Sequence, residues 1–266
     1  MKDYINIFYC ISNNFGDAIN PIIAELIFKK PIVWTQTSDE IKHLILCGSI
    51  LNHANQNSTV IGAGLAQAGD VVNRHVNILA VRGKITEDII RNKFGYKQPV
   101  GLGDPVLLLP RILELPRPEK KYKVGIIPHY VDQAVLYELY HKRLTENGNF
   151  FKLINSLESS PIKMINDALS CEKIITSSLH GLVLGFAYDI PTQWCKITNK
   201  IIGGNMKFLD FYSSIDATDV KAPRAISDIM PMTNEEIFAH IGETRYTEKI
   251  TTIQNNLLAI FETLKK

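Results

Sequence analysis

The stretch from Lys173 to Cys195 constrains the fold more than any other part of the sequence. Its pattern indicates an apolar strand, a polar turn, an apolar helix and a second strand, at Ile174 to Thr176, Ser177 to Gly181, Leu182 to Tyr188 and Pro191 to Cys195. Such a βαβ unit belongs in a parallel sheet. His180 falls where the first strand ends and the helix begins. In open α/β sheets this edge is where ligands bind.

The first half of the chain repeats the pattern of short apolar strands that end in small or polar residues. We predict strands at Tyr4 to Ile11, Leu44 to Cys47, Val60 to Gly62 and Ile78 to Val81. The first helix is expected to take Asn20 as its cap and Pro21 at its first position. The second is expected to cover Lys84 to Phe94 and to end at Gly95. These strands are typical of a parallel sheet with functional loops at its carboxyl edge.

The second half follows the same plan. We predict strands at Val124 to Ile127 and Phe150 to Ile154, helices at Asp132 to Leu144 and Pro161 to Leu169, and a mostly helical tail from Asn234 to Lys266. A loop that begins at Gly203-Gly204 is expected to carry Lys207 and Asp210.

A charged segment that contains Pro116 and Pro118 lies between the halves and is typical of a linker. The sequence therefore predicts an α/β protein with two Rossmann-like domains, residues 1–118 and 119–266, that face a cleft in a GT-B-like arrangement. We expect the C-terminal helix to pack back on the first domain.

Composition narrows the function classes. The chain has 29 Lys and Arg against 27 Asp and Glu, and this net charge of +2 does not favour nucleic acid as a partner. The four cysteines form no CxxC pair, which favours buried thiols in a reducing compartment. Asn6 interrupts the apolar stretch near the N-terminus, and no run approaches the roughly 18 apolar residues of a membrane span. We expect a cytoplasmic protein, with the inner face of the membrane as an alternative.

Several common sites are not supported by motif spacing. Gly62-Ala63-Gly64 follows a strand, but Gln67 stands where the dinucleotide fingerprint needs its third glycine, so NAD or FAD is not expected. The turn suits close approach of the backbone to a ligand or to another loop. There is no Walker A, HExxH or GxSxG sequence, and no cluster at metal-ligand spacing. We therefore expect no metal and no resident cofactor.

Four polar residues near predicted strand ends are candidates for chemistry, and each has an ordinary alternative. Arg82, before Gly83, can hold a phosphate or carboxylate bidentately, or it can form a salt bridge. His180 and His129 can exchange protons with an anionic substrate, or they can be buried core residues. Asp17 can bind a sugar hydroxyl or act as a base, or it can simply begin a helix.

Together these motifs resemble the polysaccharide pyruvyl transferase family over about residues 12 to 212. The matching stretches are Asn14-Phe15-Gly16-Asp17, Gly48-Ser49-Ile50-Leu51, Gly62-Ala63-Gly64, Val81-Arg82-Gly83, Gly103-Asp104-Pro105 and the block from Ile174 to Pro191. The resemblance implies a GT-B-like fold. It also implies an enzyme that moves a pyruvyl group from phosphoenolpyruvate to two hydroxyls of one sugar, forming a ketal in the synthesis of a polysaccharide such as an exopolysaccharide.

By the same resemblance, Arg82 and His180 fall on positions associated with phosphoenolpyruvate binding and catalysis, and Leu179 lies in the same pocket. Protonating C3 of phosphoenolpyruvate makes C2 electrophilic, so the reaction needs an acid, an anion clamp and a base. We assign His180 as the acid and Asp17 or His129 as the base. The expected substrate-binding residues are Arg82, Gly16, Gly64, Ser177, Ser178, Leu179 and Lys207. The acceptor is expected to be a saccharide, with a lipid-linked form among the alternatives.

One position departs from the family pattern. Some members carry an arginine two residues before the histidine, where this chain has Ser178. Lys207 or Arg74 would then supply the missing charge, although Lys207 and Asp210 also have the spacing of an ordinary i, i+3 pair. Two other functions therefore stay open: a GT-B-type glycosyltransferase that uses a nucleotide sugar, and a non-catalytic subunit of a polysaccharide-assembly complex.

Overall fold

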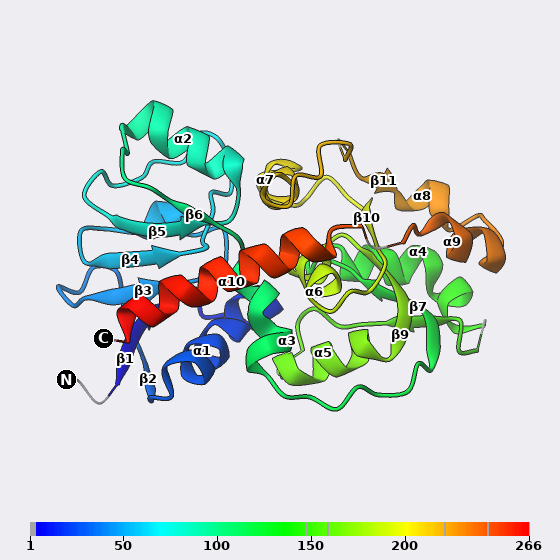
Figure 1. Cartoon of the computed structure of the whole chain (residues 1–266). Coiled ribbons are helices and arrows are strands. Elements are labelled where there is room, and N and C mark those ends of the chain that lie inside the picture. Colours follow the sequence, from blue (N-terminus) through cyan, green and yellow to red (C-terminus); the bar gives the residue numbers. More distant parts are fainter. Residues whose placement is uncertain (1–3, 147, 159, 221, 244, 266) are drawn as a thin grey trace.

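The protein contains two parallel β-sheets with helices packed against them (Figure 1). The computed structural model describes residues 4–146, 148–158, 160–220, 222–243 and 245–265. The predicted α/β class is confirmed. Lys266, at the end of the predicted helical tail, lies outside the described residues.

The first sheet belongs to the N-terminal half. Within the described residues its strand order is β2-β1-β3-β4-β5-β6, and all of its strand pairs are parallel. The strands are β1 (Ile5–Phe8), β2 (Ile32–Trp34), β3 (His43–Ile45), β4 (Ser58–Ile61), β5 (Asn77–Val81) and β6 (Gly101–Leu102). The helices are α1 (Phe15–Phe28), η1 (Leu51–His53), α2 (Lys84–Phe94), η2 (Pro105–Leu108) and α3 (Leu109–Ile112).

The second sheet begins after the predicted linker. Its order in the described residues is β11-β10-β9-β7-β8, again with parallel pairs. The strands are β7 (Tyr122–Ile127), β8 (Phe151–Leu153), β9 (Cys171–Thr176), β10 (Thr192–Lys196) and β11 (Arg224–Ala225). The helices are α4 (Gln133–Thr145), α5 (Pro161–Leu169), α6 (Leu179–Ala187), α7 (Met206–Ser214), α8 (Ile226–Ile229), α9 (Asn234–His240) and α10 (Thr247–Leu264).

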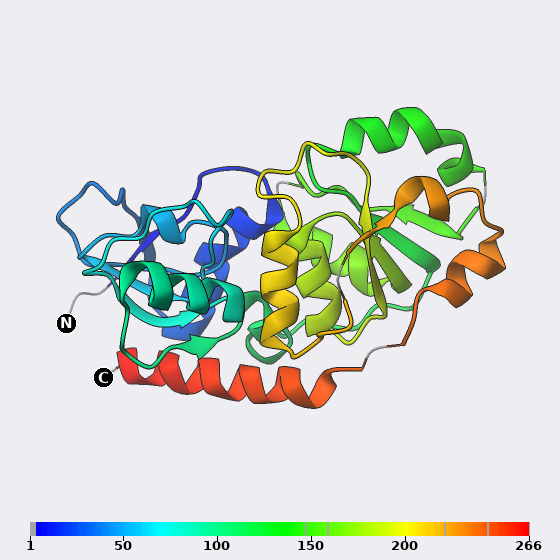
Figure 2. The ribbon, with the colours of Figure 1, turned by 90° about the horizontal axis from the view of Figure 1, so that it is seen from above.

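Helix α10 joins the two halves. It starts beside the second sheet and runs along the molecule to the first (Figures 1 and 2), where Leu264 near its end lines a cavity together with Tyr4. Ile253, Leu257 and Phe261 form its buried face, and Gln254 Nε2 donates a 2.7 Å hydrogen bond to the Leu107 carbonyl oxygen. This contact requires Gly103, since a Cβ there would lie 2.3 Å from the Ile253 side chain.

Helix α6 lies at the centre of the molecule, and all of its residues are buried. Such an apolar helix is stable only where other elements cover every face, and here η2 from the first half packs against it. The helix begins at Leu179, earlier than the apolar run predicted, because the Ser178 hydroxyl caps it by accepting from the Gly181 N–H at 3.4 Å. His180 is therefore held in its first turn.

The predicted start of the first helix was wrong. Helix α1 begins at Phe15, and Pro21 lies inside it. A proline there leaves the carbonyl of Asp17 without its helical donor. The Asn20 side chain replaces that donor: its Nδ2 donates to the carbonyl oxygens of Gly16 at 2.8 Å and Asp17 at 3.1 Å.

The predicted loop after Gly203-Gly204 is also wrong, because helix α7 begins at Met206. Phe208 and Phe211 are buried, and Phe208 stacks on Trp194 with ring centroids 4.6 Å apart. Helix α7 also packs against α2 of the first half, a contact that the local sequence does not indicate.

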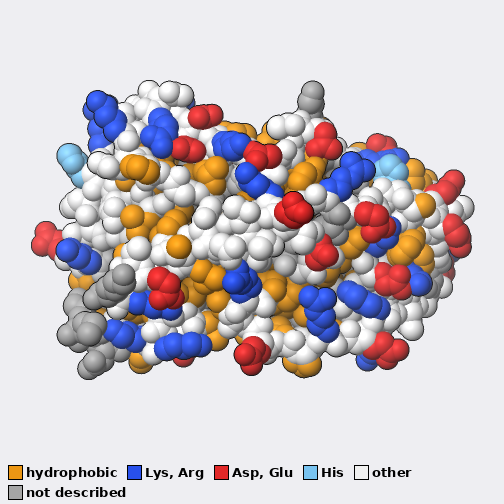
Figure 3. Space-filling model, in the orientation of Figure 1, with side chains coloured by type: hydrophobic (Ala, Val, Ile, Leu, Met, Phe, Trp, Pro, Cys, Tyr) orange, Lys and Arg blue, Asp and Glu red, His pale blue; other side chains and the backbone are white. Residues whose placement is uncertain are grey.

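The surface carries charges of both signs. On the face shown in Figure 3, basic and acidic side chains are interspersed, as the near balance of the two kinds leads one to expect. Among the described residues, none of the helices has both the length and the apolar character that crossing a bilayer requires.

Candidate functional site

The strand order of both sheets predicts where a ligand would bind. In each sheet the chain leaves its first strand to one side and returns on the other, between β1 and β3 in the first sheet and between β7 and β9 in the second. Ligands in open α/β sheets bind at the carboxyl ends of such switch points. A cavity of about 450 Å³ is lined by residues that follow these four strands, among them Asp17, Ser49, His129 and His180.

The cavity brings together six of the residues singled out from the sequence. These are Asp17, His129, Ser178, Leu179, His180 and Lys207. The chain segments that carry them come from both sheets, so the site exists only when the two halves are in contact. The remaining predicted residues, Gly16, Gly64, Arg82 and Ser177, are not among the lining residues.

Two of these four act by letting another side chain approach. A Cβ on Gly16 would lie 1.9 Å from His180 Nδ1, so the absence of a side chain makes room for the imidazole. A Cβ on Gly64 would lie 2.5 Å from the Arg82 guanidinium carbon. Ser177 is buried, donates to Asp132 Oδ2 at 2.7 Å and accepts from the His129 N–H at 2.9 Å. It thereby fixes the backbone of His129 at the cavity wall.

Arg82 is fully buried behind the cavity. Its Nε donates to Asp210 Oδ2 at 2.9 Å, and its other nitrogens donate to Ser49 Oγ at 2.8 Å and to the Leu65 carbonyl oxygen at 2.7 Å. The guanidinium thus joins β5 to helix α7 of the second half. Ser49 lies between Arg82 and the cavity, because it both accepts from Arg82 and lines the cavity wall.

Lys207 provides a cation in the cavity itself. It lies on α7, one turn before Asp210, so the Arg82–Asp210 pair holds the helix that carries it. Burial, and then the positive charge of Arg82, lower the pKa of Lys207 to about 8, while Asp132 and Asp17 act in the opposite direction. Arg74, the other candidate for this charge, is exposed and is not among the lining residues.

His180 is the most enclosed of the titratable groups that line the cavity. Burial lowers its pKa to about 3, with smaller contributions from the positive charges of Arg82 and Lys207 and from His129. Its Nε2 lies 3.7 Å from Asp104 Oδ2. The low pKa makes the imidazole neutral at physiological pH, and a bound anion would favour its protonation.

The two candidate bases lie on opposite halves. Asp17 accepts hydrogen bonds from Ser12 Oγ at 2.6 Å and Asn14 Nδ2 at 3.3 Å, and burial raises the pKa of its carboxyl group. Burial and then Lys207 lower the pKa of His129 to about 4. His129 is consequently neutral at physiological pH and able to accept a proton.

Asp104 is a functional candidate that the sequence analysis did not single out. It is fully buried, follows β6 and faces His180. Burial raises its pKa to about 6. The available signal was its position in the Gly103-Asp104-Pro105 turn after a strand, but the sequence does not indicate that this turn meets α6.

One group among the described residues has the composition of a metal site. Cys47, Asp104 and His180 each place a ligand atom within 4.8 Å of the others, and thiolate, carboxylate and imidazole are zinc ligands. However, Cys47 Sγ is 3.3 Å from Asn20 Oδ1 and 3.6 Å from the Gly16 carbonyl oxygen, positions that suit a thiol donor. Burial also raises the pKa of this thiol.

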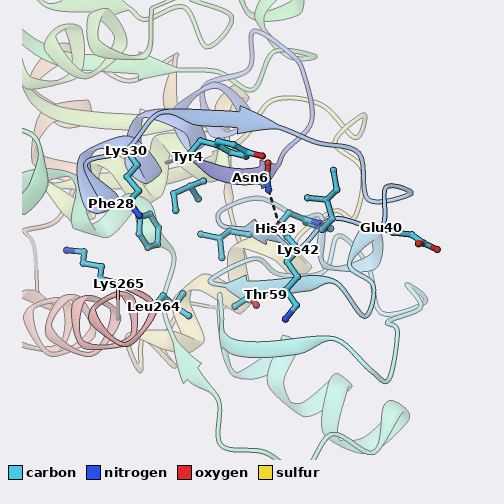
Figure 4. A pocket seen from close by; sticks show the side chains of 13 residues that line it. Tyr4, Asn6, Phe28, Lys30, Glu40, Lys42, His43, Thr59, Leu264 and Lys265 are labelled. Carbon is cyan, nitrogen blue, oxygen red and sulfur yellow. Dashed lines mark hydrogen bonds between the residues drawn. The ribbon is translucent and has the colours of Figure 1, made fainter. Parts of the chain in front are cut away.

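A larger cavity, of about 670 Å³, lies at the opposite edge of the first sheet (Figure 4). Phe28 and Leu264 contribute apolar surface, and Lys42 and Glu40 extend outward. Its histidine, His43, has both ring nitrogens engaged, by the Ile41 carbonyl oxygen and by Ser58 Oγ, each at 2.8 Å. Among the described residues that line this cavity, Glu40 extends outward and His43 has both nitrogens engaged, whereas the smaller cavity gathers Asp17, His129 and His180; we therefore take the smaller one as the candidate active site.

The chain is similar to known proteins over most of its length. The model of a family described as polysaccharide pyruvyl transferase matches residues 2–195, which include the cavity residues up to His180. The chain is also 30% identical over 204 residues to the uncharacterized protein L143 of Acanthamoeba polyphaga mimivirus, covering 75% of this chain and 70% of that protein. No solved structure matches the chain.

Proposed function

The chain belongs to the polysaccharide pyruvyl transferase family, and on that premise we propose that it transfers a pyruvyl group from phosphoenolpyruvate to a saccharide, forming a ketal. The observation that carries this proposal is the meeting of His180 and Lys207 in one cavity at the switch points of both sheets. A proton donor beside a cation is what pyruvyl transfer from an anionic enol phosphate requires.

The proposed arrangement is GT-B-like, with two Rossmann-like domains facing a cleft. In its support, each half has its own parallel sheet, the switch points of both sheets face the same cavity, and α10 returns to the first half.

The donor is proposed to bind with its anionic groups between Lys207 and the N-terminus of α6. The first N–H groups of a helix attract anions, and Ser178 and Leu179 line the cavity at this point. Lys207 takes the place of the arginine that Ser178 replaces. Arg82, enclosed by Asp210, Ser49 and Leu65, contributes positive potential from behind rather than a direct clamp.

The proposed chemistry then proceeds in three steps. His180, protonated once the anionic donor is bound, gives its proton to C3 of phosphoenolpyruvate while a sugar hydroxyl adds to C2. Asp17 or His129 accepts the proton of that hydroxyl. The C2–O bond to phosphate breaks, and the leaving inorganic phosphate takes up the proton held by the base. A second hydroxyl of the same sugar adds to C2 and closes the ketal, and its proton passes to the neutral His180 imidazole, which restores the acid.

We propose that no metal takes part, because Cys47 is placed as a protonated thiol and Lys207 can neutralise the phosphate. The acceptor is proposed to be a polysaccharide or its precursor, in lipid-linked or other form. A cytoplasmic location is proposed because all four cysteines are free.

The test is an assay of phosphoenolpyruvate-dependent product formation. Wild-type protein is incubated with phosphoenolpyruvate and a panel of free, nucleotide-linked and lipid-linked sugars, and mass spectrometry detects pyruvylated product. We expect His180→Ala to lower turnover about 100-fold or more, and Lys207→Ala mainly to weaken donor binding. Lys142→Ala, on the exposed face of α4, is the matched control. A wild-type protein stabilised by nucleotide sugars but not by phosphoenolpyruvate would refute the proposal and favour a glycosyltransferase.

A further inference from the structure

Beside the cavity, two buried polar atoms face each other without hydrogen-bond partners among the described residues. They are His180 Nε2 and Asp104 Oδ2, separated by 3.7 Å. An unpartnered buried polar atom costs free energy, so a facing pair of them needs a physical explanation.

Asp104 is held in a fixed orientation. Its Oδ1 accepts a 3.0 Å hydrogen bond from the Val106 N–H and thereby caps η2. The side chain is fully buried and the following residue is Pro105. The free oxygen, Oδ2, is therefore directed at the imidazole by the fold of the first half.

His180 presents its two nitrogens to different surroundings. Nε2 is enclosed and faces Asp104. Nδ1 lies on the other side of the ring, next to Gly16, in a side chain that lines the cavity. Because Nε2 is enclosed and faces Asp104, Nδ1 is the ring nitrogen left to exchange a proton with a molecule in the cavity.

We propose that Asp104 is a positioning residue for His180. Its carboxylate accepts the Nε2–H, fixes the neutral imidazole as the Nε2–H tautomer and leaves Nδ1 to exchange the proton. This inference rests on the proposed function for its catalytic meaning, but the tautomer is a property of the protein alone. The 3.7 Å separation exceeds a hydrogen bond, and such contacts tighten when substrate binds.

The proton balance of the step is simple. The imidazolium gives the proton on Nδ1 to C3 of the donor, and Nε2 keeps its own proton throughout. Asp104 stays ionised and stabilises the imidazolium while it exists. Its pKa of about 6 leaves it ionised at pH 7.

Other charged groups around the His180 ring affect the pH at which it is protonated. The charged and titratable groups that act on His180 or Asp104 are Arg82 after β5, His129 after β7, and Lys207 and Asp210 on α7. Cys47, after β3, lies next to both, and Asp17 on α1 acts on Cys47. Arg82, Lys207 and His129 oppose the imidazolium. The Asp104 carboxylate, on the enclosed side of the ring, therefore offsets part of the unfavourable effect of these groups on the imidazolium.

The direct test is long-range ¹H–¹⁵N NMR of the histidine rings. In wild-type protein near pH 7.5 we expect His180 as the Nε2–H tautomer. In Asp104→Asn the amide can place an N–H toward Nε2, so the tautomer should switch to Nδ1–H. His43 is an internal control, because its Nδ1 must donate to the Ile41 carbonyl oxygen in both proteins.

A wild-type His180 in the Nδ1–H form would overturn the proposal. This test uses the wild-type protein alone, so it does not depend on whether a variant folds. An unchanged tautomer in folded Asp104→Asn would overturn it as well. So would stoichiometric zinc in the wild-type protein that is lost in Cys47→Ser, since Nε2 would then be a metal ligand.

Kinetics give the second arm. We expect Asp104→Asn to lower kcat about 100-fold or more while KM for phosphoenolpyruvate changes little, because the effect lies on proton transfer. Asp88→Asn, on the exposed face of α2, is the control. If wild-type protein shows no turnover but the tautomer switches, the proposed function fails and the positioning role stands. Equal turnover in wild type and Asp104→Asn would refute the catalytic part of the inference.

Discussion

Asp210→Ala should destabilise the protein far more than any exposed ion-pair mutation. Asp210 is fully buried and receives three hydrogen bonds from the first half, from Arg82 Nε at 2.9 Å, Thr86 Oγ1 at 2.7 Å and the Thr86 N–H at 2.8 Å. Thr86 is in the first turn of α2, whose N-cap position is Gly83 and has no side chain. The carboxylate of α7 thus caps a helix of the other half.

The expected loss in the free energy of unfolding follows from these contacts. Removing one partner of a buried ion pair leaves an uncompensated charge, here that of Arg82, and costs about 3–5 kcal/mol. Losing the cap of α2 costs about 1 kcal/mol more. We expect a loss of about 4–6 kcal/mol in the free energy of unfolding.

The assay is urea unfolding followed by circular dichroism. With an m-value of about 2–3 kcal/mol/M, the midpoint should fall by more than about 1 M. Asp216→Ala is the matched control, because Asp216 also pairs with lysines but is 46% exposed. It should cost less than about 1 kcal/mol.

A double variant separates charge from packing. Arg82→Met/Asp210→Leu replaces both charges by apolar side chains and should be more stable than Asp210→Leu alone. If Asp210→Ala cost no more than Asp216→Ala, or if the double variant were less stable than the single one, the buried pair would not hold the two halves together as argued.

Three further predictions concern the cavity and its supports. Gly16→Ala should abolish turnover, because its Cβ would lie 1.9 Å from His180 Nδ1, whereas Gly69→Ala, with no atom within 4 Å, should behave as wild type in the same assay. The affinity for phosphoenolpyruvate, measured by calorimetry, should fall as pH rises through about 8, because Lys207 loses its proton there. Lys207→Arg should remove that fall because arginine stays charged. A fall in affinity that persists in Lys207→Arg would show that another group is responsible. Asn20→Leu should lower the free energy of unfolding by about 2–4 kcal/mol in urea titrations, since it deprives the buried Cys47 N–H and the Asp17 carbonyl of their partners; a change below about 0.5 kcal/mol would show that Asn20 does not support α1.

Local pattern was sufficient for most elements. Helix α2 covers Lys84–Phe94 as predicted, because its apolar spacing is helical and Gly95 adopts the left-handed conformation with φ 69° that ends it. Helix α5 covers Pro161–Leu169 as predicted, and Ser160 caps it. These signals act within one turn, so the sequence itself contains the physical cause.

The sequence also located the cavity, because parallel strands bring their carboxyl ends to one edge. Asp17, His129 and His180 were found as polar residues after apolar strands, and all three line the cavity. That inference depended only on the direction of the strands and did not require the positions of side chains.

The tertiary structure alone decided which groups meet across the two halves. Arg82 and Asp210 are separated by 128 positions, and nothing in their local sequence indicates that the arginine is enclosed while Lys207 enters the cavity. The pairing of Asp104 with His180 has the same origin. Local propensity acts over a few residues, whereas these contacts form only when the two halves pack together. The arrangement of charges around the cavity is therefore set by the packing of the halves, and the sequence around each residue does not determine it.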